Sequence, residues 1–152
     1  MIRNLSLFIF LCLLIGCAKQ DVEVHSLNGV WKKDAKQTFT FEVTDAENPK
    51  NIIFVVRNNN NYPYSNIRFF STLSAEGDKT SKVDTLNYVL AKPNGEWIGT
   101  GFGDTKETWF QYKNAYHFPK NGKYTISVVQ AMRKDSLIGI EDFGIKLEQV
   151  QP

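Results

Sequence analysis

Much of the chain alternates between hydrophobic and polar residues with a period of two. Residues 38–43 are the clearest case, because every second residue is phenylalanine or valine and the others are threonine or glutamate. Residues 143–147 near the end alternate in the same way. This pattern predicts half-buried β-strands. Residues 52–56 are hydrophobic at every position, which predicts a central strand that is covered on both faces.

Short segments of this kind, separated by glycine, proline and asparagine turns, continue along the chain through 67–73, 83–90, 97–102, 112–118 and 123–129. No stretch repeats hydrophobic residues at helical spacing over three turns. About eight short strands with regular turn signals are typical of sandwiches and barrels. The sequence therefore predicts an all-β fold, an antiparallel β-sandwich of about eight strands, with the jelly roll as one candidate topology.

The N-terminus has a different pattern, which indicates export. Arg3 precedes residues 5–15, which are hydrophobic except for Ser6. A helix that spans a bilayer needs about 20 hydrophobic residues, so this run predicts a cleaved signal peptide rather than a permanent span. It ends in Leu14-Ile15-Gly16-Cys17, which resembles the lipobox of bacterial lipoproteins. The alternative is an ordinary secretory signal that is followed by an incidental cysteine.

The lipobox predicts that Cys17 becomes the lipidated first residue of the mature protein. Its thiol would carry diacylglycerol and its amine an acyl chain such as palmitate, which together give a stable membrane anchor. Ala18 follows where lipoproteins retained in the inner membrane have aspartate, so we expect the outer membrane, at its periplasmic face or at the cell surface. The expected organisation is a signal peptide at 1–16, a lipidated tether at 17–27 and one β-sandwich domain at 28–152.

Charge and cysteine content limit the functional classes. The formal net charge is +2, and it falls to about +1 when Arg3 leaves with the signal peptide. So small a charge, without a basic run, argues against electrostatic binding to nucleic acid. Cys12 is also lost and Cys17 is lipidated, so we expect no disulfide, thiolate metal site or cysteine nucleophile. Two histidines, His25 and His117, are too few for a zinc site on their own.

Candidate catalytic residues are weak. No serine lies in a Gly-x-Ser-x-Gly motif, and Gly99-Thr100-Gly101-Phe102-Gly103 lacks the following helix of a dinucleotide-binding loop. Asp84 and Asp142 would serve a glycosidase only if they faced each other across a cleft. We expect these two carboxylates instead to pair with arginines that lie on or beside apolar strands, namely Arg57, Arg68 and Arg133. The prediction is a protein without enzymatic activity, cofactor or metal.

Aromatic residues are the remaining candidates for binding. Exposed rings on a sandwich can stack on sugars or anchor a protein interface, so Trp31, Trp97 and Trp109 leave a carbohydrate-binding module as the alternative function. Loops carry function on rigid sandwiches. We therefore expect residues 58–65 and 96–103 to form a partner-binding end of the domain, with these candidate residues: Tyr62, Pro63, Tyr64, Asn66 and Trp97.

Several motifs, in order along the chain, resemble the gliding-motility lipoprotein GldH family. They are Arg57-Asn58, Tyr62-Pro63-Tyr64-Ser65-Asn66-Ile67, Asp84-Thr85-Leu86, Gly95-Glu96-Trp97-Ile98-Gly99-Thr100-Gly101, Phe118-Pro119, Gly122-Lys123-Tyr124, Gln130-Ala131-Met132-Arg133 and Leu137-Ile138-Gly139-Ile140-Glu141-Asp142-Phe143-Gly144-Ile145. The lipobox also lies where the family has it. The resemblance implies a lipoprotein needed for gliding, in which surface adhesins are propelled along the cell. It implies partners in the motility apparatus and its associated secretion machinery, and it transfers no catalytic residue.

Overall fold

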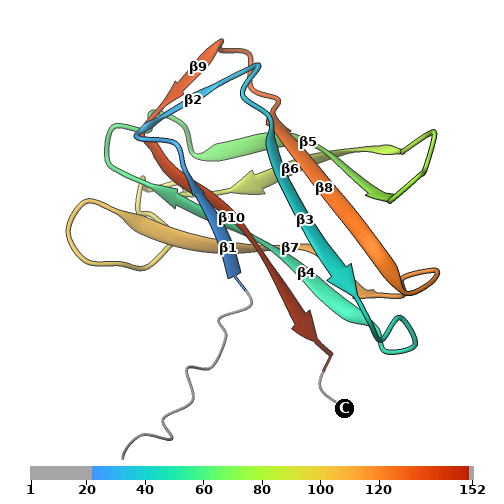
Figure 1. Ribbon diagram of the computed structural model, residues 1–152. Helices are drawn as coiled ribbons and strands as arrows, with labels where there is room; N and C mark the ends of the chain where they lie inside the picture. Colours follow the sequence, from blue (N-terminus) through green and yellow to red (C-terminus); the bar gives the residue numbers. More distant parts are fainter. Residues whose placement is uncertain (1–21, 151–152) are drawn as a thin grey trace, which may run out of the picture.

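The computed structural model describes residues 22–150, which form ten β-strands and, within that range, no α-helix (Figure 1). The strands are β1 (Val22–Ser26), β2 (Val30–Lys32), β3 (Gln37–Val43), β4 (Lys50–Asn58), β5 (Asn66–Ala75), β6 (Val83–Val89), β7 (Lys106–Tyr116), β8 (Gly122–Gln130), β9 (Ser136–Ile138) and β10 (Ile140–Gln149). Within these residues, no helix is both long and apolar enough to cross a membrane. The predicted all-β class is confirmed.

Two four-stranded antiparallel sheets form the sandwich. One sheet has the strand order β1-β10-β4-β7 and the other β3-β8-β5-β6, while β2 and β9 pair as a short ribbon at one end of the molecule (Figure 1). Strands that are distant in sequence therefore lie next to each other, as β1 and β10 do. The edge strands β1 and β3 lie along the same side of the sandwich, where His25 of β1 stacks on Phe39 of β3 with ring centroids 4.3 Å apart.

Aromatic side chains from both sheets meet in the core. Trp31 is fully buried and its ring centre lies 5.0 Å from Phe143 and 5.4 Å from Phe69. Phe54 approaches Phe143 to 5.2 Å from the neighbouring strand. Such ring pairs add to the free energy that burial of their hydrophobic area provides. The tryptophan indole is also satisfied, because its N–H donates to the Ala35 carbonyl at 2.8 Å.

The uniformly hydrophobic segment 52–56 forms the middle of β4, between β10 and β7. Phe54 points into the core and is fully buried. Ile53 and Val55 point to the other side of the sheet, and they are still only 8% and 2% exposed. The prediction that this strand is covered on both faces is therefore confirmed, since the residues on its outer side are buried as well.

The β-sandwich begins earlier in the chain than the sequence predicted. Residues 22–26, assigned to the tether from the sequence, form β1 and pair with β10. At Gly144 of β10 a side chain would collide with the Glu23 carbonyl and with Val24, so the missing side chain lets β1 approach closely. The β1 sequence alternates over only four residues, Val22-Glu23-Val24-His25, which is a weak strand signal by itself. It pairs with a strand that is distant in sequence, in which a glycine leaves room for it.

The predicted strand at 97–102 is wrong. This segment makes only two isolated bridges, Ala91 with Trp97 and Thr100 with Glu107, and otherwise forms the loop between β6 and β7. The following strand begins at Lys106, six residues before the predicted start at residue 112. Period-two glycines resemble strand alternation in the sequence, but here they permit close loop packing. A side chain at Gly99 would collide with the Glu107 carbonyl, and one at Gly101 with that of Thr105.

Candidate functional site

The two loops predicted to act together lie at the same end of the sandwich. Residues 58–65 join β4 to β5, and residues 96–103 belong to the connection from β6 to β7 (Figure 1). Asn60 joins them, since its side-chain oxygen accepts a hydrogen bond from the Trp97 indole at 3.0 Å and its amide donates to Asp104 at 2.9 Å. We call residues 58–65 and 96–103 the loop end.

Asn59 fixes the first of these loops to the strand pair β9–β10. Its backbone N–H donates to the Gly139 carbonyl at 2.8 Å, and its side-chain amide donates to Glu141. Its side-chain oxygen accepts from the N–H of Asn61 at 2.8 Å. Asparagine side chains commonly form such turns with their own backbone. The asparagine run is therefore a turn that is held by hydrogen bonds within itself and to two neighbouring segments, residues 139–141 and 97–104.

Tyr62 does not lie on the surface, contrary to our expectation of an exposed contact residue. It is 2% exposed, and its hydroxyl donates to the Asn66 carbonyl at 2.8 Å. Burial raises the pKa of Tyr62 well above its usual range. The Tyr62–Pro63 peptide bond is trans. Tyr62 is thus a core residue that attaches the loop end to the interior of the sandwich.

The other predicted contact residues are accessible to differing degrees. Pro63 is exposed, while Tyr64, Asn66 and Trp97 are partly buried. Tyr64 packs edge-on against Tyr62 with ring centroids 5.5 Å apart. Asn66 donates a hydrogen bond to Asn87 at 2.6 Å.

Sequence reasoning missed the most exposed aromatic residue of the loop end. Phe102 is fully exposed between Gly101 and Gly103. The Lys106 ammonium donates to the carbonyls of Gly101 and Gly103, at 3.1 and 2.9 Å, and this holds the loop tip in shape. The Phe102 ring is therefore accessible to a partner, although a single exposed apolar residue is by itself common on protein surfaces. The sequence signal for this exposure is a phenylalanine between two glycines, because glycines have no side chains that could cover its ring.

A second aromatic residue lies on the outer face of the sheet that contains β4. Trp109 of β7 is 51% exposed, its indole donates to Glu107 at 2.6 Å, and the Lys146 ammonium lies 4.8 Å from its ring centre. Beside it, the Arg57 guanidinium contacts Glu107 at 2.7 Å and Asp142 at 3.4 Å. The predicted pairing of Arg57 with Asp142 is therefore confirmed, with Glu107 as an additional partner. Burial raises the pKa of Glu107, but the hydrogen bonds from Arg57 and Trp109 outweigh it and leave that pKa below its usual range.

The remaining predicted ion pairs are wrong. Asp84 pairs with Lys113 at 2.6 Å and accepts a hydrogen bond from the Tyr112 hydroxyl at 2.9 Å, so a lysine takes the place of the expected arginine. Arg68 and Arg133 are exposed. Asp84 and Asp142 are each engaged with a different cation. The arrangement offers no reason to assign them to a glycosidase pair.

The three tryptophans occupy three different environments. Trp31 is in the core, Trp97 is partly buried in the loop end, and Trp109 is on the outer sheet face. Among the three tryptophans, Trp109 is the one whose ring is about half exposed and could serve as a flat stacking surface. Cys17 and its lipobox lie outside the described residues, and so does the predicted lipid attachment.

Comparison with known proteins identifies the family. The family model described as GldH lipoprotein matches residues 21–147, which cover both sheets and the loop end. The chain belongs to the GldH lipoprotein family. The family predicted from the ordered motifs is therefore confirmed.

Two members of the GldH lipoprotein family are similar along almost their whole length. The gliding motility lipoprotein GldH homolog of Christiangramia forsetii is 38% identical, over 95% of this chain and 95% of that protein. The gliding motility lipoprotein GldH of Flavobacterium johnsoniae is 37% identical, over 90% of each. Among solved structures, a carbohydrate-binding module specific for non-crystalline cellulose is 8% identical with a TM-score of 0.42, over 86% of this chain and 80% of that one.

Proposed function

We propose that this protein is a lipid-anchored accessory component of the gliding-motility apparatus and its associated secretion machinery. The observation that carries the proposal is membership of the GldH lipoprotein family, with relatives named for gliding motility that match over 90% or more of this chain. The proposed role is structural. The protein supports assembly or stability of the apparatus through contacts with other envelope proteins, without catalysis and without a cofactor or metal.

Cys17 is the proposed point of attachment to the membrane. The hydrophobic run, the small Gly16 and the cysteine support this assignment. Two or more acyl chains anchor a protein stably, whereas one binds only marginally. We place the domain at the outer membrane, on its periplasmic face, because Ala18 is not the aspartate that marks retention in the inner membrane.

The loop end is the proposed protein-contact surface. Phe102 and Trp97 would act as anchors, because aromatic residues contribute much of the binding energy at protein interfaces. Asn60 supports this function, since its two hydrogen bonds fix the relative position of the loops before a partner binds. Less conformational freedom is then lost on binding. Tyr62 is left out of this surface because it is buried.

Complementation of a deletion strain tests the anchor and the contact surface separately. We expect loss of the gene to abolish spreading and adhesin movement, and Cys17→Ala not to restore them. Phe102→Asp should fail to restore gliding although the protein is still membrane-bound at normal abundance. Val83→Asp is the control, because Val83 is also an exposed apolar residue but lies on the edge strand β6, outside the loop end. A deletion strain that glides and secretes normally would contradict the whole proposal.

Carbohydrate binding is the second candidate, and the half-exposed Trp109 ring supports it. Polar groups of Arg57, Glu107 and Asp142 lie beside this ring and could bond sugar hydroxyls. A glycan array with the wild type and with Trp109→Ala tests this function. Binding that is lost in Trp109→Ala but kept in Trp97→Ala would favour it, and absence of binding to any glycan would eliminate it.

A further inference from the structure

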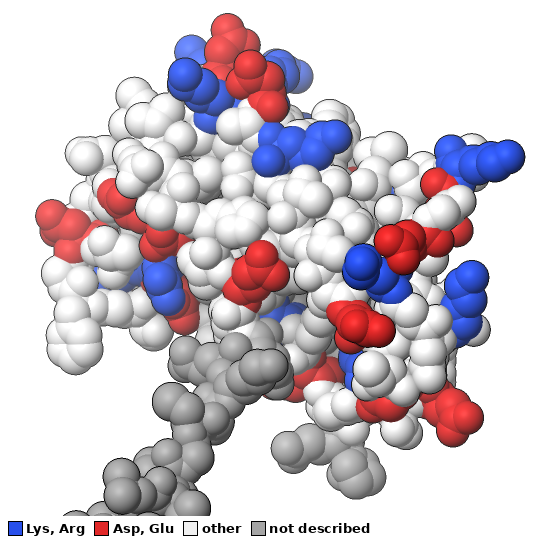
Figure 2. Space-filling model, in the orientation of Figure 1, with Lys and Arg blue, Asp and Glu red and all other residues white. Residues whose placement is uncertain are grey.

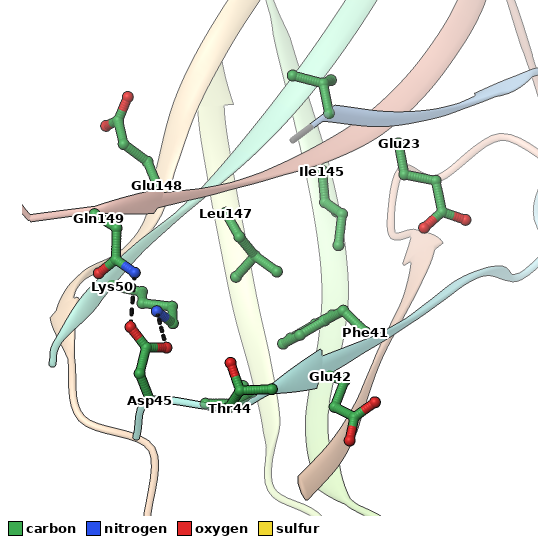
Figure 3. Close-up of a pocket in the computed structure, with 12 residues that line it drawn as sticks. Glu23, Phe41, Glu42, Thr44, Asp45, Lys50, Ile145, Leu147, Glu148 and Gln149 are labelled. Atoms are coloured by element: carbon green, nitrogen blue, oxygen red, sulfur yellow. Dashed lines mark hydrogen bonds and ion pairs between the residues drawn. The ribbon is translucent and has the colours of Figure 1, made fainter. Parts of the chain in front are cut away.

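A cleft opens along the side of the sandwich where the two edge strands β1 and β3 face each other. At one end the sheets are closed by His25, which stacks on Phe39 and hydrogen-bonds Gln37 at 3.1 Å. Towards Val22 and Val43 the edges enclose a cleft of about 610 Å³ (Figure 3). This cleft is separate from the loop end and from the Trp109 face.

The interior of the cleft is apolar. Phe41 and Val43 line it from β3, and Ile145 and Leu147 line it from β10. Figure 3 shows the side chains of Phe41, Ile145 and Leu147 pointing towards the same space. Val43 and Ile145 are almost completely buried, whereas Phe41 and Leu147 are only partly buried. The cleft therefore has room at its mouth for an additional apolar side chain.

The margins of the cleft are acidic. Its lining holds four carboxylates, from Glu23, Glu42, Asp45 and Glu148, and one ammonium, from Lys50. Lys50 is already paired with Asp45 at 2.6 Å and keeps the pKa of that carboxyl below its usual range. Glu148 is paired with Lys146 at 2.8 Å, so within residues 22–150 the carboxylates of Glu23 and Glu42 are the two at the margin without a lysine or arginine partner. Figure 3 shows Glu42 and Glu148 pointing outwards at the margins, and in Figure 2 acidic side chains lie on this face of the molecule with basic ones between them. Charge complementarity therefore favours a basic ligand.

The cleft also has a free strand edge. Within residues 22–150, β3 pairs only with β8, so its other edge is open. In an antiparallel pair, every second residue directs its N–H and C=O groups away from the partner strand. An open edge of this kind is a template for a further strand. The backbone of residues 41–43 thus offers hydrogen bonds next to the apolar interior.

We propose that this cleft binds an extended polypeptide segment of a partner protein, with alternating apolar and basic residues, as an additional strand on the edge of β3. In a strand, alternate side chains point to opposite faces. The apolar ones would enter the space beside Phe41 and Leu147, and the basic ones would meet Glu42 and its neighbours outside. Strand addition gains affinity from the backbone and specificity from such alternate side chains.

The position of the cleft also places the partner relative to the membrane. Val22 lines the cleft, and Cys17 is five residues earlier in the chain, at most ~18 Å away when extended. A lipidated Cys17 would hold the cleft close to the bilayer, so the partner segment would lie near the membrane surface. This placement rests on the proposed function, whereas the binding itself does not.

Peptide binding to the mature protein in nonionic detergent tests the proposal. The probe is a fluorescein-labelled peptide, Lys-Val-Lys-Ile-Lys-Val-Lys, followed by fluorescence anisotropy. The matched peptide has glutamate in place of each lysine. We expect the basic peptide to bind at least tenfold more tightly than the acidic one, and more weakly as salt is added. We also expect it to slow hydrogen exchange of the amides of residues 41–44.

Two sets of variants locate the site. Leu147→Lys should weaken binding at least tenfold, whereas Val83→Lys on the β6 edge should not. Glu23→Lys with Glu42→Lys should also weaken it, unlike Glu76→Lys with Glu96→Lys elsewhere on the surface. Protection of residues 41–44 from hydrogen exchange is measured on the wild type and locates the bound peptide without any variant. The test is therefore still possible if a variant folds poorly.

Three results would overturn the inference. One is equal affinity for the basic and acidic peptides, and another is protection elsewhere than residues 41–44. The third is a tenfold gain in peptide affinity when residues 18–21 are deleted, because the chain's own N-terminal segment would then be the occupant. Since binding is measured on purified protein, failure here is distinguishable from failure of the motility role, which is measured by gliding of the deletion strain.

Discussion

The indole N–H of Trp97 donates a hydrogen bond to the side-chain oxygen of Asn60 at 3.0 Å, across a separation of 37 residues. The same asparagine bonds Asp104 through its amide. One side chain therefore couples two loops that share no strand pairing. We therefore expect the relative position of the two loops in the proposed contact surface to depend on Asn60.

Replacing Asn60 should loosen the loop end without unfolding the domain. Asn60 is exposed, so we expect Asn60→Ala to cost about 1 kcal/mol of unfolding free energy. Hydrogen exchange in residues 96–105 should become faster, because Trp97 and Asp104 lose their shared partner. Asn114→Ala, an exposed asparagine of β7, is the control and should leave these amides unchanged. Unaltered exchange in Asn60→Ala would show that the loops are held independently.

Trp31 and Trp109 should differ sharply in their contribution to stability. Trp31 is fully buried among Phe69 and Phe143, so Trp31→Ala should cost about 3–5 kcal/mol. Trp109 is half exposed, and Trp109→Ala should cost about 1 kcal/mol or less. Urea denaturation of both variants checks the difference. Similar losses would mean that Trp109 is covered in solution by contacts that its exposure does not indicate.

Alanine substitutions at Gly139 and Gly95 should differ in stability, because both cause backbone strain but only the one at Gly139 also causes a steric collision. Both have positive φ, 89° and 86°, which costs about 1–3 kcal/mol when another residue takes the glycine's place. At Gly139 a side chain would also overlap the backbone of Tyr62, whereas at Gly95 it meets open space. Gly139→Ala should therefore destabilise the domain clearly more than Gly95→Ala. Thermal unfolding measures both, and equal shifts in Tm would contradict the close approach of Gly139 to Tyr62.

Asp84 should make stability depend on acidic pH. Its burial raises the pKa, but hydrogen bonds from Lys113 and Tyr112 outweigh this and leave the pKa below its ordinary value of 3.8. Because the unfolded chain then binds the proton more readily, this stabilisation is complete above about pH 3.8 and is lost as the pH falls through the lower folded pKa.

Asp84→Asn tests this contribution. We expect it to lower the unfolding free energy at pH 7 by about 1 kcal/mol, since the charged hydrogen bonds are weakened. The difference from the wild type should shrink as the pH falls below 3.8. Asp34→Asn, at an exposed position, is the control. A difference between wild type and Asp84→Asn that is the same at pH 7 and at pH 3 would argue against the ion pair with Lys113.

Local features of the structure could be predicted from the sequence because they depend on neighbouring residues. Alternation in 38–43 and the uniform run 52–56 report which faces of a strand are buried, and both appear as predicted in β3 and β4. The ordered motifs were likewise sufficient to predict the family. The juxtaposition of the two loops was predicted too, although the residue that joins them, Asn60, was not singled out.

Pairing between distant segments could not be predicted in this way. β1 pairs with β10, in which Gly144 leaves room for it, and Asp84 pairs with Lys113 because of how the two sheets pack. Phe102 and Tyr62 are both aromatic residues in loops, yet one is fully exposed and the other buried. Which ring reaches solvent depends on contacts made across the whole fold, such as that of Tyr62 with Gly139.

By itself, the sequence determined the family, the all-β class and the pattern of buried strand faces, because these depend on residue type and on spacing along the chain. Only the tertiary structure decided which loop residues are accessible, which charges are paired, and that β3 has an open edge beside an apolar, acid-rimmed cleft. The physical reason is that exposure, ion pairing and free hydrogen-bonding edges are properties of segments brought together by folding.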